Sequence, residues 1–402
     1  MRYRSHLNTA KKIIEEYRAS EPLSIYLKNF FAADKKYGSK DRKQITALCY
    51  NYYRIGNAVK NIALEEKILI GTFLCNQTEN DFLNFLKPEW SKIVAKPLKK
   101  KYSILQFSPE DVFPWITELS EGIDHYKFAE SFLIQPDLFI RIRPNKMGVV
   151  EKKLKKANIA FEITGSDCMA IKNSSNLTDI LIIDKEAVIQ DFNSQKVLDF
   201  LKSPASPIHN DSKSISLAWD CCAASGGKSI LLYDIFKIKI DLTVSDIRLS
   251  ILLNLHKRFR AAAIKNYRYF VSDIGNPDFK FPPLIAKGNQ IFLSAISFPI
   301  IVCDVPCTGS GTWSRTPEQL FYFDPQQINS FAEKQKKIVS NAIPQLQSGG
   351  ILFYITCSVF KKENEEVVHF IKERFHLHLL QMKLLKGYDK KADSMFVAIF
   401  QK

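Results

Sequence analysis

Two cysteines stand fifty residues apart in settings that suit covalent chemistry on a nucleobase. Cys307 ends an Asp-Val-Pro-Cys segment that begins at Asp304, and Cys357 is the centre of a Thr-Cys-Ser segment. Each segment follows an apolar run, at 300–303 or 351–354, that is typical of a strand. A cysteine thiolate can add to carbon 6 of cytosine, which makes carbon 5 nucleophilic. The residues therefore favour base modification by two thiols and one carboxylate in a common pocket, and they leave open which thiol attacks.

A glycine-rich turn indicates a place for a cofactor. The turn at 221–229 follows a strand-like run and begins a helix, so its backbone can approach a ligand and the helix N-terminus offers free amides. Asp246 and Asp273 follow the next two expected strands, where carboxylates can bind ribose hydroxyls and an adenine amino group. No second phosphate-binding loop appears, which favours S-adenosylmethionine over a dinucleotide. An ordinary strand-to-helix turn and a capping role for Asp246 are the alternatives. The residues assigned to cofactor binding are Cys222, Ala223, Ala224, Ser225, Gly226, Gly227, Lys228, Asp246, Arg248, Asp273 and Asp304.

The elements that must position these residues form a repeated strand and helix pattern from residue 190 onward. Strands, with helices between them, are expected at 215–220, 240–245, 268–272, 299–304, 351–356 and 395–400. This alternation predicts an α/β fold with a Rossmann-like, mostly parallel sheet whose terminal strand is antiparallel. The carboxyl ends of parallel strands line the ligand crevice in such a sheet, so the cysteines, the carboxylates and the glycine turn are expected to converge there.

The first part of the chain has a different pattern. Residues 1–105 show apolar residues at helical spacing, and 106–130 are expected to form a helical link. A strand is expected at 138–143, a helix at 148–157, and further strands at 159–163, 168–172 and 180–183. The predicted domains are an all-α domain at 1–130, a small α+β module at 131–189 and the α/β domain at 190–402. Two loops, at 203–214 and 282–297, are expected to be surface insertions.

Composition and charge narrow the classes of function. The 402 residues have a net charge of +15, and residues 1–105 hold 20 Lys and Arg against 10 Asp and Glu, which favours a polyanionic partner such as RNA. No stretch approaches about 18 consecutive apolar residues, and the start of the chain lacks the apolar core of a signal peptide, so a cytoplasmic protein without membrane contact is expected. Eight cysteines in a chain of this length do not indicate a disulfide framework. A zinc site is not indicated either, because no Cys-x-x-Cys pair occurs. A monomer without a metal is expected.

The order of the motifs resembles one family. The sequence resembles the Fmu/Sun and nucleolar-protein group of RNA cytosine-5 methyltransferases throughout residues 190–402. The segments in that family's order are 190–195, 220–229, Asp246, Asp273, 304–307, 356–358 and 363–365. Residues 1–105 resemble the NusB-like helical domain of the Fmu branch, mainly through 39–54, and 138–190 resemble a small RNA-recognition-like insert. Ser225 stands where the family usually has proline, Thr308 replaces a common serine, and 314–318 is a loose version of an arginine-rich segment.

The resemblance implies methylation of cytosine in RNA with S-adenosylmethionine as cofactor. It assigns Cys357 as the nucleophile, Asp304 as the residue that holds the base and Cys307 as the group that assists release, although DNA cytosine methyltransferases use the Pro-Cys cysteine as nucleophile. Lys228 is expected to contact the methionine carboxylate or the target base. Small-subunit ribosomal RNA is the expected substrate and transfer RNA the alternative. A non-catalytic NusB-like RNA-binding protein and a nicotinamide-dependent oxidoreductase are the competing interpretations, and the latter leaves both cysteine motifs unexplained.

Overall fold

The chain divides into two compact units, which we describe separately from a computed structural model. Residues 2–34, 36–173, 175–208, 216–236, 239–282 and 297–402 are described. Within these ranges the first unit comprises residues 2–119, 123–136 and 312–325, and the second comprises 120–122, 137–311 and 326–402. Most of the two predicted surface loops, at 203–214 and 282–297, lies outside the described residues.

The first unit is helical, as the spacing of its apolar residues predicts. Its core is formed by the apolar faces of the longer helices, with Ile13, Leu48 and Phe73 fully buried. The likeness of this unit to a NusB-like domain stays a prediction. Its amino-terminal helices are α1 (Arg2–Glu16), α2 (Leu23–Ala33), α3 (Ser39–Arg54), α4 (Leu64–Cys75), α5 (Asp81–Leu86), α6 (Pro88–Ser91), α7 (Leu98–Leu105) and α8 (His125–Ser131), with 3-10 turns at Pro109–Val112 and Ile116–Glu118.

A segment from the carboxyl-terminal half of the sequence completes the first unit. Helix α12 (Pro317–Tyr322) packs on α3. The Glu318 carboxylate accepts a hydrogen bond from the Leu23 amide at 3.2 Å, and the Tyr322 hydroxyl donates to the Tyr17 carbonyl at 2.9 Å. The sequence of the carboxyl-terminal half does not predict that α12 packs in the first unit. A helix of six residues has no local pattern that identifies its packing partner.

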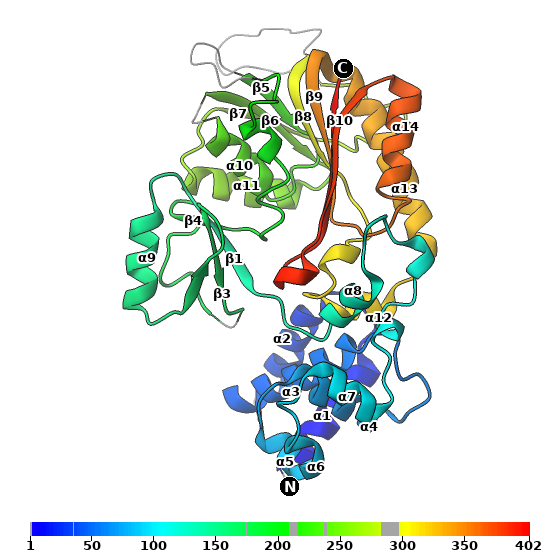
Figure 1. Cartoon of the computed structure of the whole chain (residues 1–402). Helices are drawn as coiled ribbons and strands as arrows, with labels where there is room; N and C mark the ends of the chain where they lie inside the picture. Colours follow the sequence, from blue (N-terminus) through cyan, green and yellow to red (C-terminus); the bar gives the residue numbers. More distant parts are fainter. Residues whose placement is uncertain (1, 35, 174, 209–215, 237–238, 283–296) are drawn as a thin grey trace. The chain divides into compact units, whose positions relative to one another are not determined.

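The second unit contains a seven-stranded sheet (Figure 1). The sheet order is β10-β11-β9-β8-β5-β6-β7, with β5 to β9 parallel and β11 antiparallel to β9. The predicted fold class is therefore confirmed. The sequence pattern does not predict β10, because its apolar and polar residues do not alternate along the whole strand. The strands are β5 (Ser216–Asp220), β6 (Ile240–Asp246), β7 (Tyr267–Val271), β8 (Phe298–Asp304), β9 (Leu346–Thr356), β10 (His378–Leu385) and β11 (Met395–Gln401).

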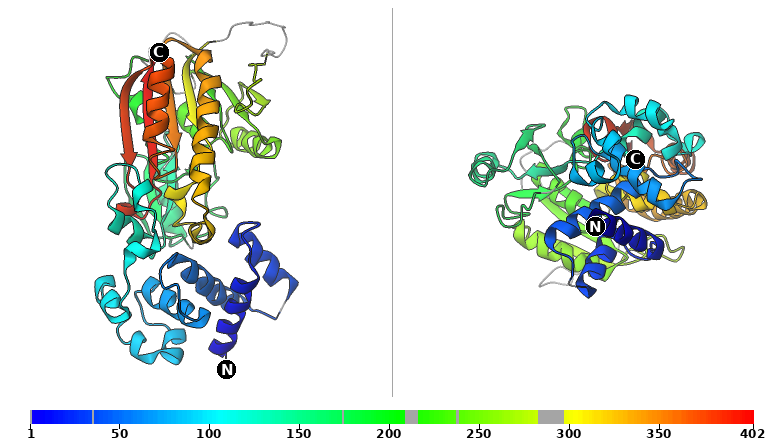
Figure 2. Two further views of the ribbon diagram at one scale, coloured as in Figure 1. Left: turned by 90° about the vertical axis from the view of Figure 1, so that its right-hand side faces the viewer. Right: turned by 90° about the horizontal axis from the view of Figure 1, so that it is seen from below.

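Helices cover both faces of this sheet. Helices α10 (Gly227–Ile235) and α11 (Leu249–Ala261) pack on one face. Helices α13 (Gln326–Ala342) and α14 (Glu365–Phe375) pack on the other, where Figure 2 shows them side by side. Successive residues of β8 alternate between the two cores, with Ile300 under α10 and α11 and Ile301 under α13 and α14. Burial on both faces explains why β8 reads as a continuous apolar run.

The strand order reverses between β5 and β8. The chain proceeds outward from β5 through β6 to β7, and outward in the other direction from β8 to β9. In an open parallel sheet, a ligand crevice forms outside the carboxyl ends of the strands at such a reversal. The residues that follow β5 and β8 are therefore placed at the position where this architecture binds ligands.

A small antiparallel sheet with the order β2-β3-β1-β4 also belongs to the second unit. Helix α9 (Met147–Lys156) packs on it through Val150 and Leu154. Whether residues 131–189 and 190–402 are separate domains stays a prediction. The strands are β1 (Leu138–Ile142), β2 (Phe161–Ile163), β3 (Cys168–Ile171) and β4 (Ala187–Ile189).

The strand predicted at 180–183 is wrong. The amides of Ile180 and Leu181 both donate to the Leu177 carbonyl, which closes a turn, and β4 is the strand that pairs with β1. Leu177 and Leu181 are four residues apart and both buried, whereas Ile182 is half exposed. This spacing follows a helical turn rather than the alternation of a strand.

Candidate active site

The structure brings the two cysteines together beyond the ends of β8 and β9. The Sγ atoms of Cys307 and Cys357 lie 3.3 Å apart, and both residues are partly exposed. Gly311 fixes the two loops, because its amide donates to the Cys357 carbonyl at 2.8 Å and its carbonyl accepts from the Ser394 amide at 2.9 Å. A Cβ atom at Gly311 would lie 2.1 Å from the Ser394 carbonyl oxygen, so this close approach requires glycine.

A buried carboxylate braces both cysteine loops. Thr308 and Ser358 each follow one of the cysteines in sequence. Glu363 accepts hydrogen bonds from the Thr308 amide at 2.8 Å, from the Thr308 hydroxyl at 2.6 Å and from the Ser358 hydroxyl. The buried Gln335 amide donates to the same carboxylate at 3.1 Å. Burial raises the pKa of Glu363, although these donors act in the opposite direction.

The two thiols differ in their surroundings. The hydrogen bond with Cys357 and burial raise the pKa of Cys307 well above its usual value. Either sulfur can be the donor of the hydrogen bond between them. The geometry therefore pairs the two thiols and does not by itself assign their roles.

An ion pair lies beside the thiols. The Lys228 Nζ atom is 2.6 Å from Asp304 Oδ2, and 13% of the Lys228 side chain is exposed. Burial acts to lower the pKa of Lys228, but the Asp304 carboxylate outweighs it, and Cys357 adds to the increase, so the pKa of Lys228 is raised. The partner of Lys228 among the described residues is thus the carboxylate that was assigned to hold the base.

The glycine-rich turn has the backbone that its sequence indicates. Ala224 and Gly226 have φ angles of +46° and +83°, and α10 begins directly after them. A Cβ atom at Gly226 would lie 2.8 Å from the Phe259 ring and 3.0 Å from the Leu255 side chain of α11. Glycine therefore lets the turn adopt this conformation and lie close to α11.

A cavity of about 400 Å³ lies at the carboxyl ends of the strands. Asp246 accepts hydrogen bonds from the Ala224 amide at 3.1 Å and the Arg248 amide at 3.0 Å, and Asp273 accepts from the Gly275 amide at 2.9 Å. A carboxylate has about four lone-pair sites, so both can still accept hydrogen bonds from a ligand. The cavity is lined by Cys221, Cys222, Ala224, Asp246, Ile247, Arg248, Ser272, Asp273, Ile274, Asp304, Pro306, Lys334 and Ile338.

Asp220, at the end of β5, is buried and accepts a hydrogen bond from the Ser229 hydroxyl at 2.6 Å. Its other carboxylate oxygen has no hydrogen-bond partner among the described residues. Burial raises the pKa of Asp220 to about 7.

Only some of the residues predicted to bind the cofactor line the cavity. Those that line the cavity are Cys222, Ala224, Asp246, Arg248, Asp273 and Asp304. Ala223 is buried in the core, Gly226 faces α11, and Ser225 is bonded to Arg258 of α11. Arg315, a cation of the loose arginine-rich segment, belongs to the first unit.

Sequence reasoning missed the contributions of α13. Lys334 and Ile338 line the cavity from this helix, and Gln335 of the same helix donates to the Pro306 carbonyl at 3.0 Å. No local motif marks these positions, because only the packing of α13 on the sheet places them there. Glu363 could have been found through its motif, but the spacing does not reveal that it bonds to both loops.

Comparisons with known proteins show what the α/β domain is similar to. Residues 209–399 match the family model described as 16S rRNA methyltransferase RsmB/F. This match covers just under half of the chain. The resemblance to the Fmu/Sun group is confirmed by this match.

Curated relatives of this chain include a small subunit methyltransferase B and a small subunit methyltransferase F. It is 30% identical over 252 residues to the probable ribosomal RNA small subunit methyltransferase B of Bacillus subtilis, which covers 61% of this chain and 52% of that protein. It is 41% identical over 75 residues to ribosomal RNA small subunit methyltransferase F of Shewanella amazonensis, covering 19% of this chain and 16% of that protein. The chain thus matches about half or less of the length of these relatives.

A solved structure shares the fold of this chain. The crystal structure of PH0851 superposes with a TM-score of 0.68 over 95% of both chains, at 18% sequence identity. No described helix of the chain is long and apolar enough to cross a membrane. Within the described ranges, no group of three or more His, Cys, Asp or Glu residues is arranged to hold a metal ion.

Proposed function

We propose that this chain is an S-adenosylmethionine-dependent RNA cytosine-5 methyltransferase that acts through a covalent cysteine adduct on small-subunit ribosomal RNA. The observation that supports it most is the 3.3 Å separation of the Cys307 and Cys357 sulfurs beside the ion pair of Lys228 and Asp304. The family match supports the same class of reaction. Transfer RNA stays the alternative substrate.

The cavity has the chemistry that an adenosyl cofactor needs. Ile247, Ile274 and Ile338 give apolar walls for an adenine ring, and the Asp246 carboxylate is placed to accept hydrogen bonds from ribose hydroxyls. The free amides at the start of α10 suit the methionine carboxylate. S-adenosylmethionine, when bound there, supplies an electrophilic methyl group.

The protein's own residues would then act in sequence. The Cys357 thiolate adds to carbon 6 of a cytosine that has left its stack, which places an electron pair on carbon 5. Asp304 holds the base, and the Lys228 ammonium, 2.6 Å from Asp304, offsets negative charge that develops on the ring. After carbon 5 takes the methyl group, a base removes its proton and the electron pair expels the Cys357 sulfur. Cys307 assists this release by donating its proton to the departing sulfur.

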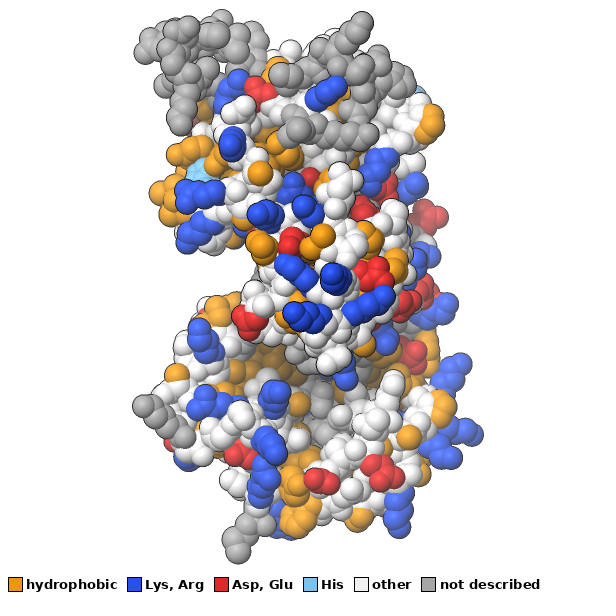
Figure 3. All heavy atoms as spheres, turned by 90° about the vertical axis from the view of Figure 1, so that its left-hand side faces the viewer, with side chains coloured by type: hydrophobic (Ala, Val, Ile, Leu, Met, Phe, Trp, Pro, Cys, Tyr) orange, Lys and Arg blue, Asp and Glu red, His pale blue; other side chains and the backbone are white. Residues whose placement is uncertain are grey.

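Surface charge supports an RNA partner. Figure 3 shows Lys and Arg side chains spread over one face of the molecule, with fewer Asp and Glu side chains among them. With a net charge of +15, such a surface favours a polyanion. The charge does not choose between RNA and DNA, and the family match favours RNA.

The test uses the full chain with a radiolabelled methyl donor and either 16S ribosomal RNA or transfer RNA. We expect the wild type to label 16S RNA at cytosine 5, C357A to form neither product nor adduct, and C307A to accumulate an adduct that survives denaturing electrophoresis. Adducts formed by C357A but not by C307A would reverse the two roles. Absence of methyl transfer by the wild type to either RNA would overturn the proposal.

A further inference from the structure

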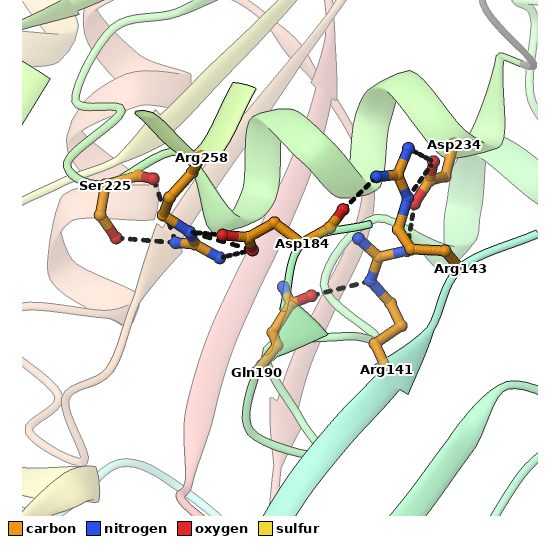
Figure 4. Close-up of polar contacts among 7 residues, drawn as sticks. All are labelled: Arg141, Arg143, Asp184, Gln190, Ser225, Asp234 and Arg258. Carbon is orange, nitrogen blue, oxygen red and sulfur yellow. Dashed lines mark hydrogen bonds and ion pairs between the residues drawn. The ribbon is translucent and has the colours of Figure 1, made fainter. Parts of the chain in front are cut away.

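A chain of charged hydrogen bonds runs from the small antiparallel sheet to the cofactor turn (Figure 4). It begins at Asp234 of α10, whose carboxylate binds Arg141 at 2.5 Å and Arg143 at 2.9 Å, both from β1. The side chains of these three residues are at most 10% exposed. Arg141 also donates to the Gln190 side chain at 2.9 Å. The small sheet is therefore fixed to α10 by buried ion pairs.

Asp184 passes this network to α11. Its backbone carbonyl accepts from Arg143 at 2.5 Å, while its carboxylate accepts two hydrogen bonds from Arg258, from Nε at 3.0 Å and from Nη2 at 2.8 Å. Asp184 lies in the left-handed region with a φ of +65°, which is uncommon for a residue with a side chain. This conformation lets one residue bond to Arg143 with its carbonyl and to Arg258 with its carboxylate.

Arg258 then reaches the turn that borders the cavity. Its Nη1 atom donates to the Ser225 carbonyl and to the Ser225 hydroxyl, each at 3.0 Å. Ser225 lies between Ala224, which lines the cavity, and Gly226, which directly precedes α10. With Asp184 holding its Nε and Nη2 atoms, the Arg258 guanidinium is fixed in plane, so it can hold the turn in one position.

From this network we propose that Arg258 is a positioning residue for the cofactor, and that Asp184 makes cofactor affinity depend on the docked small sheet. The inference rests on the proposed function, because it concerns binding in the same cavity. Arg258 touches neither reacting group; it acts by holding Ser225, and through it the amides at the start of α10. Loss of this support leaves the chemistry intact and weakens the binding of cofactor.

The test measures binding of S-adenosylhomocysteine to the full chain by isothermal calorimetry. Loss of a charge-assisted hydrogen bond is expected to weaken binding by R258Q about tenfold. D184N keeps a residue that tolerates the left-handed region but removes the charge that orients Arg258, so we expect a smaller loss, about threefold. R258K should recover part of the affinity, because it keeps one donor. The matched control is R268Q, which removes a partly exposed ion pair of the seven-stranded sheet, Arg268 of β7 with Asp241 of β6 at 2.8 Å, and should bind like the wild type.

Kinetics separate positioning from general loss of structure. In R258Q, KM for S-adenosylmethionine should rise while kcat at saturating cofactor stays at the wild-type value, and the double variant R258Q/D184N should bind no more weakly than R258Q alone. Equal affinity of R258Q and the wild type would overturn the inference, as would a fall in kcat with an unchanged KM. If the wild type itself does not bind S-adenosylhomocysteine, the proposed function fails instead.

Discussion

Replacing Gly311 by alanine tests whether the spacing of the two cysteine loops sets the rate. The new Cβ atom would lie 2.1 Å from the Ser394 carbonyl oxygen and 2.9 Å from the Cys357 carbonyl oxygen. Ordinary van der Waals contact begins at 3.4 Å, so the loop that carries Cys307 and Gly311 must move about 1 Å away from Ser394 and about 0.5 Å away from Cys357. A misplacement of this size in a reacting group costs about 100-fold in rate. We therefore expect G311A to transfer methyl groups about 100-fold more slowly, with a loss of stability of about 1–3 kcal/mol from overpacking.

The assay is single-turnover methyl transfer to 16S ribosomal RNA, with circular dichroism and thermal unfolding of the same preparations. The control is G148A, because no atom lies within 4 Å of a Cβ placed on Gly148 of α9. That variant should keep the wild-type rate and melt at the same or a slightly higher temperature, since alanine favours a helix. A G311A rate within about threefold of the wild type would refute the reasoning, because the loops would then tolerate a change of spacing that the mechanism forbids.

Two further predictions concern the buried carboxylates. E363Q replaces an acceptor of the Thr308 and Ser358 hydrogen bonds by a group that is partly a donor, so we expect a loss of about 2–3 kcal/mol in the free energy of urea unfolding together with slower methyl transfer. The control is E365Q, because the Glu365 carboxylate accepts from the Ser120 hydroxyl and the Glu121 amide instead, and it should keep the wild-type rate. Equal rates for the two variants would count against the role of Glu363. Asp220 titrates near its ordinary value of 3.8 in the unfolded chain and at about 7 in the fold, so the folded protein binds the additional proton between these values and its stability falls as pH rises through that window. Between pH 5 and pH 8 the wild type should therefore lose about 2 kcal/mol more unfolding free energy than D220N, and parallel pH profiles of the two proteins would contradict the burial argument.

The sheet and its crevice could be predicted because their signals are local. Burial on both faces makes β8 and β9 continuous apolar runs, and the functional side chains follow directly at their carboxyl ends. Strand β10 lacks such a signal, because its apolar and polar residues do not alternate along the whole strand. The turn at 180–183 resembles a strand in sequence, because Leu181, Ile182 and Ile183 form a short apolar run, but its buried residues follow helical spacing.

The parts of the site that escaped prediction depend on residues distant in sequence. Ser225 and Arg258 are 33 positions apart and belong to different elements, and Asp184 and Arg258 are 74 positions apart. Motif order locates Cys307, Cys357 and Asp304, but it contains no information on which side chains hold their loops. Bonds such as those of Glu363 to two loops follow only from the packed structure.

The insertion of α12 has a consequence for synthesis of the chain. The bonds of Glu318 with Leu23 and of Tyr322 with Tyr17 join residues 295 and 305 positions apart. Ribosomes add about 5–20 residues per second, so about 15–60 seconds separate the emergence of α1 from that of α12. During this interval the surface that receives the buried Leu320 has no cover from α12. The helical unit begins the chain, yet it reaches its final form only after most of the parallel sheet has left the ribosome.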